Sequence, residues 1–193
     1  MASTPAATEL AGAGPALDLR PATDADQPQL ATLYRATRDD LTRLGDSPAI
    51  DALIAMQQRV HAEGLRRQYP CARQWLLHQD GRCVAQLVLD WRPHRLHLID
   101  IAVLPEVRGQ GVGRALLCWV QQQARIAGVP LDLQVRRDNH PARQLYLNLG
   151  FRPGAGDELF EPMRWEPGST VSGAEQSGVN KEIVQDQPNT GQL

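Results

Sequence analysis

The middle of the chain reads Ile101-Ala102-Val103-Leu104-Pro105-Glu106-Val107-Arg108-Gly109-Gln110-Gly111-Val112-Gly113-Arg114-Ala115-Leu116-Leu117, and this stretch decides the fold. It predicts an apolar strand, a basic turn rich in glycine, and a helix that begins near Val112. Because glycine has no Cβ, the N–H groups of the turn can converge and a phosphate can approach the backbone closely. The first helical turn adds unpaired N–H groups and the positive end of its dipole, with Arg108 and Arg114 on either side. The stretch therefore predicts a binding site for a compound that carries phosphate.

Two common phosphate-binding motifs do not fit this turn. A P-loop places a lysine and then a serine or threonine after its last glycine, whereas Val112, Gly113 and Arg114 follow Gly111 here. A dinucleotide-binding fingerprint needs its third glycine at position 114, and an acidic residue about 20 positions further on in a βαβ unit. The sequence therefore argues against a nucleotide triphosphatase and against a dinucleotide-binding domain. Three glycines alone also fit a tight turn between a strand and a helix that binds nothing.

Two sequence blocks together resemble one family. The pattern Arg108-x-x-Gly111-x-Gly113, which follows the strand His97 to Leu104, is similar to the acyl-coenzyme A signature of the GNAT superfamily, the GCN5-related N-acetyltransferases. The segment from Asn139 to Phe151 resembles the N-x-x-A-x-x-x-Y-x-x-x-G-F block of the same superfamily at every fixed position. The resemblance covers about residues 17–165. It implies a single α/β domain in which helices flank a mixed, mostly antiparallel sheet, and two splayed strands form the acyl-CoA cleft.

Composition and length fit a single enzyme domain with tails. The chain has 193 residues, with 20 Lys+Arg against 22 Asp+Glu, and this balance argues against general binding of nucleic acid. No apolar run approaches the length of a membrane span, and residues 1–16 lack the features of a signal peptide, so we expect a cytoplasmic protein without membrane contacts. Residues 1–16 and 166–193 are expected to be disordered tails around a domain at 17–165. The three cysteines have no metal-ligand spacing and are expected to be reduced and mostly buried.

The pattern of apolar residues predicts the elements of the domain. Strands are expected at 17–20, 74–78, 82–90, 95–104, 131–136 and 157–165, with an Asp-Gly turn joining the second and third. Helices are expected from Asp24, capped by Thr23 and Asp26, and over 50–68, 112–127 and from Pro141 to Gly150. The helix at 112–127 is expected to bury a stripe and to end at Gly128. The stripe consists of Val112, Leu116, Trp119, Val120 and Ile126.

The resemblance also implies a reaction, in which an amine attacks the thioester carbonyl of acetyl-CoA directly. It places the pantetheine arm against the main-chain groups of Ala102 and Val103, between the strands 97–104 and 131–137. The pyrophosphate would be held by the amides of Arg108, Gly109, Gln110, Gly111, Val112, Gly113 and Arg114. Asn139 matches a position that contacts the cofactor near the thioester, and no metal is implied. Tyr146 matches the general acid that protonates the departing sulfur, although its place on a helix also fits an ordinary core aromatic.

The sequence determines the general base and the amine acceptor less closely than the cofactor site. Members of the branch that acetylates protein N-termini often carry Glu where this chain has Gln134, and an amide cannot accept a proton at neutral pH. Asp100 is the expected base, through a bound water; a strand carboxylate that is only ion-paired is the alternative, and His97 is a weaker candidate. Tyr34, Arg35, Arg38, Asp39, Asp40 and the helix at 50–68 are candidates to line the acceptor pocket, or to form a solvated face. The acceptor is a small-molecule amine or a protein amine, and a homodimer is left open.

Two other functions remain alternatives at this point. A domain that binds acyl-CoA as a sensor or scaffold, without catalysis, would explain the missing Glu at Gln134. A generic nucleotide-phosphate binder would use only the glycine turn and would bind ATP and CoA comparably. Asn139 and Tyr146 favour the N-acetyltransferase over both.

Overall fold

The computed structural model describes residues 17–38, 41 and 47–168. The two expected tails lie outside these residues, apart from positions 166–168. Within the described part, the strands form a seven-stranded sheet in the order β1-β2-β3-β4-β5-β7-β6. All neighbouring strands are antiparallel except β4 and β5, so the expected mixed, mostly antiparallel sheet is confirmed. The strands are β1 (Asp18–Pro21), β2 (Arg73–Gln79), β3 (Arg82–Arg92), β4 (Arg95–Val103), β5 (Leu131–Arg136), β6 (Arg152–Pro153) and β7 (Phe160–Trp165).

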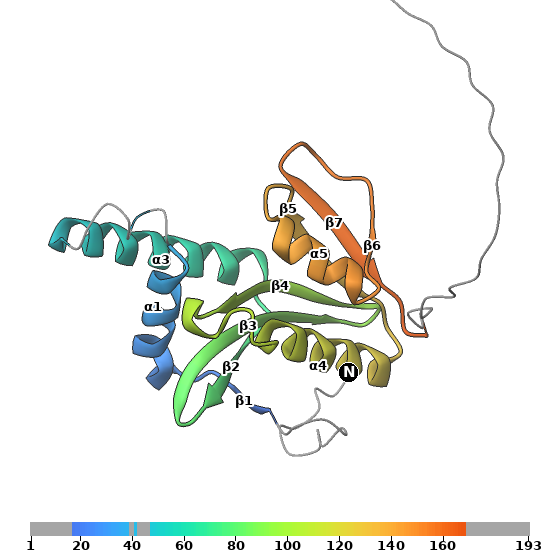
Figure 1. Ribbon diagram of the computed structural model, residues 1–193, viewed down its shortest axis with the longest axis horizontal. Coiled ribbons are helices and arrows are strands. Elements are labelled where there is room, and N and C mark those ends of the chain that lie inside the picture. Colours follow the sequence, from blue (N-terminus) through green and yellow to red (C-terminus); the bar gives the residue numbers. More distant parts are fainter. Residues whose placement is uncertain (1–16, 39–40, 42–46, 169–193) are drawn as a thin grey trace, which may run out of the picture.

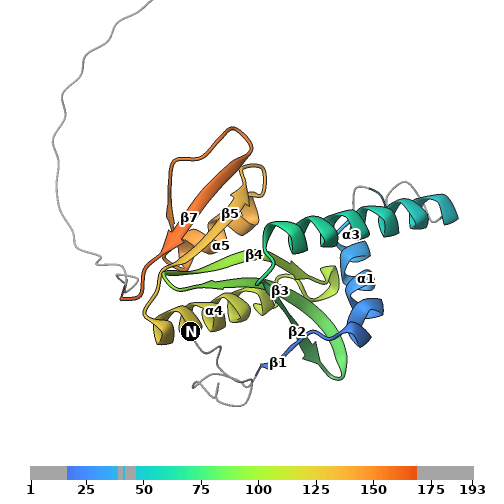
Figure 2. The same ribbon diagram turned by 180° about the vertical axis from the view of Figure 1, so that it is seen from behind.

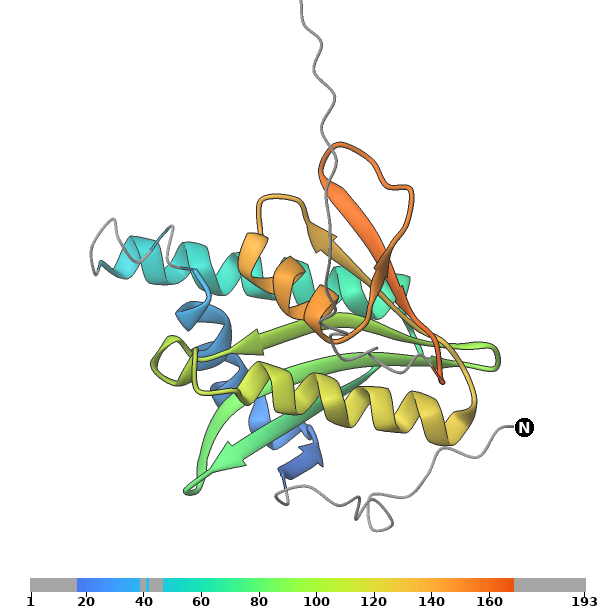
Figure 3. The same cartoon turned by 45° about the vertical axis from the view of Figure 1, so that its right-hand side comes forward.

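The helices cover both faces of this sheet. They are α1 (Gln27–Ala36), α3 (Pro48–Gln68), α4 (Val112–Ala127) and α5 (His140–Asn148), with 3-10 turns at Asp24–Asp26 and Pro105–Val107. Figure 3 shows α4 on one face of β2, β3 and β4, and α1 and α3 on the other. Figures 1 and 2 show β5 and β7 turning away from β4, with α5 beside them. This arrangement brings the end of β4 and the start of α4 to one side of the opening between β4 and β5.

Local sequence signals explain most element ends. Asp80 and Gly81 both have positive φ, 51° and 75°, which is the conformation that an Asp-Gly hairpin turn requires. Gly128 ends α4 in the left-handed conformation, as predicted. The closing strand begins at Phe160 rather than near Asp157, because the Asp157 carboxylate accepts hydrogen bonds from the N–H groups of Leu159 and Phe160 and holds a turn there.

Two burial predictions are wrong. Ile126 was expected in the buried stripe of α4 but is 65% exposed, because at about 100° per residue its side chain points about 120° away from that of the buried Val120. The other stripe residues do face the core, where the rings of Trp119 and Trp75 lie 5.3 Å apart. Only Cys83 is buried among the cysteines, while Cys71 and Cys118 are exposed; all three are free. The tendency of cysteine to be buried therefore did not predict which of the three lies in the core.

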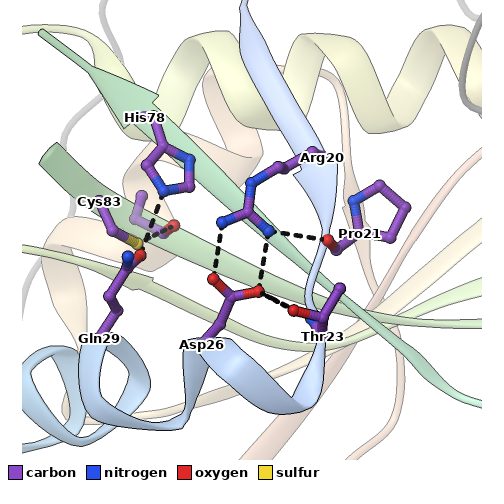
Figure 4. A network of polar contacts seen from close by, with 8 residues as sticks. Arg20, Pro21, Thr23, Asp26, Gln29, His78 and Cys83 are labelled. Carbon is purple, nitrogen blue, oxygen red and sulfur yellow. Dashed lines mark hydrogen bonds and ion pairs between the residues drawn. The ribbon is translucent and has the colours of Figure 1, made fainter. Parts of the chain in front are cut away.

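The start of the domain is held by an ion pair around Asp26 (Figure 4). The Arg20 guanidinium donates to both oxygens of the Asp26 carboxylate at 2.6 and 2.8 Å, and the Thr23 N–H and hydroxyl donate to Oδ2 at 2.8 and 2.9 Å. Thr23 and Asp26 form the predicted capping box, and the Arg20 ion pair joins β1 to this first helical turn. Beside it, the His78 ring nitrogen Nε2 lies 3.1 Å from the Gln29 side-chain oxygen, which ties β2 to α1. The network therefore fixes where α1 starts relative to the sheet.

Asp26→Asn is expected to lower the free energy of unfolding near pH 7. The hydrogen bonds from Arg20 and Thr23 hold the pKa of Asp26 well below its usual range. A carboxylate with a depressed folded-state pKa stabilises the fold above its unfolded-state pKa, and this contribution disappears as the pH falls through the folded-state pKa. Urea unfolding at pH 7 and at decreasing pH measures the effect. A difference between wild type and variant that stays constant as the pH falls would contradict the assignment.

Candidate active site

The glycine turn between β4 and α4 presents an arc of open backbone N–H groups. Gly109 and Gly111 adopt positive φ of 76° and 85°, and Gly111 is the N-cap of α4. Among the described residues, the N–H groups from Gly109 to Arg114 have no acceptor; the first amide of the region that pairs is that of Ala115, which donates to the Gly111 carbonyl at 2.9 Å. Such an arc at a helix N-terminus suits an anionic group. The turn thus has the geometry that the sequence predicts for a phosphate site.

The three glycines of this turn differ in their reason for being glycine. Gly109 and Gly111 need the left-handed conformation, and a Cβ at either would point into open space. Gly113 lies within the helix, where a Cβ would stand 3.7 Å from a methyl carbon of Leu145, an ordinary contact. Val112 is buried in the core, so only its backbone N–H is available to a ligand. The Gln110 side chain donates to the Glu106 carbonyl at 2.9 Å, which ties the turn back to the 3-10 turn before it.

The strands β4 and β5 separate after a short parallel contact. They pair only from Leu96 to Leu98 and from Leu131 to Leu133; beyond this, β4 pairs with β3 alone and β5 with β7 alone. The register of β3 and β4 also shifts here, because Leu98 faces Leu89 and Asp100 faces Val88, so Ile99 is an extra residue in β4. Facing edges of β4 and β5 are therefore unpaired within the described chain. This confirms the splayed strands implied by the family resemblance.

The hydrogen-bond ladder shows which groups of β4 face this opening. The Leu104 N–H donates to the Val84 carbonyl at 2.9 Å, so this antiparallel pair is hydrogen-bonded. Because such pairs alternate along a ladder, Ala102 also points its N–H and C=O at β3, whereas Ile101 and Val103 point theirs at the opening. This register directs the main-chain groups of Val103, but not those of Ala102, toward the opening, and the contact of either residue with the pantetheine arm stays a prediction. The Val103 carbonyl already accepts a hydrogen bond from Arg108 Nε at 3.0 Å, which places that guanidinium beside the opening.

The charge of Asp100, on β4, acts on the buried hydroxyl of Tyr146. Tyr146, on α5, is 6% exposed, and its ring centroid lies 5.6 Å from that of Phe151. Burial and then the negative charge of Asp100 raise the pKa of Tyr146 to about 12. The phenol is therefore neutral at physiological pH and able to donate its proton. Burial likewise raises the pKa of the Asp100 carboxyl, against the opposing effects of His61, Gln86 and the Ile101 N–H. This pairs a proton donor with a carboxylate of increased basicity.

Sequence reasoning missed a chain of side-chain amides behind Asp100. Gln74 Nε2 donates to Gln86 Oε1 at 2.7 Å, and Gln86 Nε2 donates to Asp100 Oδ2 at 3.0 Å. Both glutamines lie on the sheet face that carries α1 and α3, and Gln86 is buried. One signal was available, a glutamine inside the apolar run Cys83 to Leu89. A buried amide needs partners, and here one partner is the candidate base.

A cavity of about 130 Å³ opens onto Asp100 between the sheet, α1 and α3. Tyr34 and one side of α3 line it as expected, but Arg35 and Arg38 do not: Arg35 pairs with Asp51, and Arg38 donates to the side chains of Gln57 and Tyr34. Asp39 and Asp40 lie outside the described residues. The lining consists of Gln27, Leu30, Tyr34, Gln58, His61, Ala62, Leu65, Arg66, Tyr69, Ala72, Gln74, Gln86, Val88 and Asp100.

The other base candidates line a second cavity. Gln134 and His97 face this space of about 640 Å³, together with Arg95, Asp132 and Arg164, and neither lines the cavity at Asp100. Burial lowers the pKa of His97, so its neutral form is favoured. The Tyr69 ring meets the His97 ring edge-on, 5.4 Å between centroids, and lines both cavities. Asp100 therefore lines one cavity, while Gln134 and His97 line another.

Asn139 has a local structural role. It is the N-cap of α5, where its side-chain oxygen accepts a hydrogen bond from the Ala142 N–H at 3.3 Å. Pro141 in the first helical turn has no N–H to satisfy. The expected contact of Asn139 with a cofactor stays a prediction. Within the described residues no group of three or more His, Cys, Asp or Glu is placed to hold a metal ion, and no helix is long and apolar enough to cross a membrane.

The comparison with protein families decides the classification of this fold. The model of the Acetyltransferase (GNAT) family matches residues 32–151, which include the glycine turn, the splayed strands and Tyr146. The chain belongs to the GNAT family. Its GNAT sheet and helices also resemble two solved structures. One is the PaiA N-acetyltransferase of Thermoplasma acidophilum in complex with coenzyme A (TM-score 0.61, 18% identity, covering 78% of this chain and 99% of that one). The other is the ribosomal-protein-S18-alanine N-acetyltransferase of Escherichia coli (TM-score 0.60, 22% identity, covering 83% and 100%).

Two curated GNAT relatives are similar in sequence over part of their length. A candidate ribosomal-protein-bS18-alanine N-acetyltransferase of Bacillus subtilis is 36% identical over 83 residues, 40% of this chain and 49% of that protein. The aminoalkylphosphonate N-acetyltransferase of Salmonella typhimurium is 31% identical over 81 residues, 38% and 53% respectively. This GNAT chain thus spans about half the length of the curated relatives it matches. One relative is named for an alanine of a ribosomal protein and the other for an aminoalkylphosphonate.

Proposed function

We propose that this GNAT chain is an N-acetyltransferase that moves the acetyl group of acetyl-CoA to a primary amine without a covalent enzyme intermediate. The observation that carries the proposal is the arc of open N–H groups beside the unpaired edges of β4 and β5. Asp100, on β4, adds a carboxylate whose charge acts on the buried Tyr146 hydroxyl. The similarity to proteins named as N-acetyltransferases supports the same reaction class.

Each part of the site has its own role in the proposed reaction. The N–H groups of residues 109–114 bind the pyrophosphate, and the outward-facing groups of Ile101 and Val103 orient the pantetheine arm as an added strand. Asp100 takes a proton from the ammonium of the acceptor, through a water, so that the nitrogen has a free electron pair. The nitrogen then bonds to the thioester carbon, the carbon–sulfur bond breaks, and the Tyr146 hydroxyl gives its proton to the departing sulfur. The proton that the attacking nitrogen still carries passes through water to the tyrosinate, which leaves a neutral amide and a reprotonated Tyr146.

A base matters more for some acceptors than for others. An alkylamine with a pKa of about 10.4 has about one molecule in a thousand unprotonated near pH 7.4, whereas an α-amine with a pKa of about 7.8 is substantially free. Because burial raises the basicity of the Asp100 carboxylate, it suits the first kind of acceptor. Gln134, which has no basicity, lies at the second cavity. These two placements support an acceptor that enters through the cavity at Asp100.

Release of free thiol from acetyl-CoA tests the proposed function. Purified protein is incubated with acetyl-CoA and a panel of amines that includes alkylamines, amino acids and short peptides, and thiol is followed with a chromogenic disulfide. We expect release that depends on both the amine and the protein. Protection by CoA in thermal melts without release for any amine would instead indicate a sensor, and equal protection by ATP would indicate a generic phosphate binder.

Tyr146→Phe is expected to lower kcat by about 10- to 1000-fold while the Kd for CoA stays unchanged. The variant removes the hydroxyl that protonates the sulfur but keeps the ring against Phe151. The effect stays below that of many general acids because a thiol, with a pKa of about 8.5, already leaves readily. Steady-state kinetics and calorimetry with CoA measure the two quantities. Unchanged turnover would remove Tyr146 from the mechanism.

A further inference from the structure

The cavity at Asp100 carries two opposite charges. Asp100 comes from β4 at the sheet side, and Arg66 comes from the last turns of α3 at the helix side. Among the described lining residues, Asp100 is the one carboxylate and Arg66 the one guanidinium. A molecule in this cavity therefore meets a negative group at the reaction centre and a positive group on the facing helix.

Arg66 differs from the arginines around it in its partners. Arg67, the next residue, pairs with Glu63 at 2.5 Å in an i,i+4 contact, and Arg35 pairs with Asp51. Arg38 donates to the Gln57 and Tyr34 side chains. Within the part of the chain that the structure describes, no carboxylate or amide oxygen engages the Arg66 side chain. Its charge is therefore available to an anion in the cavity.

The rest of the lining favours a short polar molecule. Besides Gln86, which donates to Asp100, and Gln74, which donates to Gln86, the cavity has the side chains of Gln27, Gln58 and His61. Amides and imidazole both donate and accept hydrogen bonds. Tyr69 stands between this space and the second cavity. A cavity of about 130 Å³ holds a small molecule or the end of a chain but not a folded segment.

We propose that the acceptor is a short amine with an anionic group, a carboxylate or a phosphonate, a few bonds from its nitrogen. The nitrogen lies toward Asp100, and the anionic group lies toward Arg66. Diamines and polyamines are disfavoured, because their second ammonium would face the Arg66 guanidinium. This inference rests on the proposed N-acetyltransferase function and names the substrate class of the same site.

Matched acceptors of equal length and opposite end charge test the inference. The probes are 3-aminopropanoate against 1,3-diaminopropane and 5-aminopentanoate against 1,5-diaminopentane, with 2-aminoethylphosphonate as the phosphonate arm. The readout is the ratio of kcat/KM for the anionic and the cationic member of each pair. We expect the wild-type ratio to favour the anionic member by about tenfold or more at low salt, and less at high salt.

Charge-reversing variants at positions 66 and 67 test whether the preference depends on Arg66. Arg66→Glu is expected to lower the ratio by about tenfold or more, with Arg66→Gln in between. Arg67→Glu is the control, because it makes the same charge change one residue along, where the side chain pairs with Glu63 instead of lining the cavity. A wild-type ratio near one, or a shift in Arg66→Glu no larger than in Arg67→Glu, would overturn the inference.

A peptide with an N-terminal alanine and no acidic residue separates the two possible failures. If only this peptide supports thiol release, the chain is an N-acetyltransferase and the inferred acceptor class is wrong. If neither the peptide nor any small amine supports release, the proposed function fails, and the inference fails with it. Acetylation of the anionic small amines in preference to the peptide and the diamines supports both.

Discussion

Gly113→Glu is expected to weaken CoA binding by about 100-fold. The variant brings a carboxylate next to the N–H groups of residues 109–114, where the pyrophosphate is proposed to bind. Hydrogen bonds to a charged group are worth about 1.5–3 kcal/mol, and 1.4 kcal/mol corresponds to a factor of ten in affinity. Calorimetry with CoA measures the change.

Position 113 separates charge from backbone strain better than position 111. Gly111 has φ of 85°, so Gly111→Glu adds the cost of a side chain in a left-handed conformation to the effect of the charge. Gly113 is helical, and a Cβ there meets only Leu145 at 3.7 Å. Gly113→Gln, with equal size and no charge, is the matched control and should weaken binding far less. Full CoA affinity in Gly113→Glu would contradict the pyrophosphate assignment.

Asp100→Asn is expected to lower kcat/KM for alkylamine acceptors by about 100-fold or more, as general-base removal does. The asparagine amide keeps the size of the side chain but cannot take the proton. It also presents its own N–H₂ or oxygen to Gln86, so packing at this site changes little. CoA affinity should be unchanged, since the Asp100 side chain lines the cavity between the sheet, α1 and α3, and the groups proposed to bind CoA are main-chain groups that the substitution keeps. A loss of CoA binding equal to the loss of rate would point to a structural role instead.

The hydrogen bond from Gln86 to Asp100 allows a second test of Asp100 as the general base, through the pH dependence of activity. Gln86→Leu removes the N–H that donates to Asp100 Oδ2 at 3.0 Å. That hydrogen bond favours the charged carboxylate, so its loss raises the pKa of Asp100 further. The acid limb of log kcat/KM against pH should therefore move to higher pH. A limb that stays in place in Gln86→Leu, while activity falls uniformly, would assign Gln86 to packing only.

Most of the secondary structure could be predicted because its signals are local. The Asp80-Gly81 turn, the Thr23 and Asp26 cap, Pro141 at the start of α5 and Gly128 at the end of α4 each act within a few residues, and each is found where expected. Ile126 was misplaced because it is apolar but lies about 120° around the helix from the buried Val120, outside the stripe that faces the core.

The sequence predicted the local parts of the site but not the parts that depend on contacts between elements. The phosphate turn is contiguous in sequence, so its glycines and the following helix could be read together. The outward direction of Val103 and the inward direction of Ala102 depend on the register with β3, and the acceptor cavity depends on how α1 and α3 lie against the sheet. The link from Gln74 through Gln86 to Asp100 crosses three strands. None of these could be found without the partner strands.

The sequence by itself determined a strand, a glycine turn and a helix that together expose backbone N–H groups, because conformation over such a short span is set by local sterics and capping. Only the tertiary structure decided that Asp100 shares its surroundings with Tyr146, and that Arg66 faces the same cavity. Gln134 and His97 were assigned to a different cavity in the same way. The physical reason is that basicity and charge pairing depend on burial and on neighbours from other elements, which only the packed sheet and helices bring together.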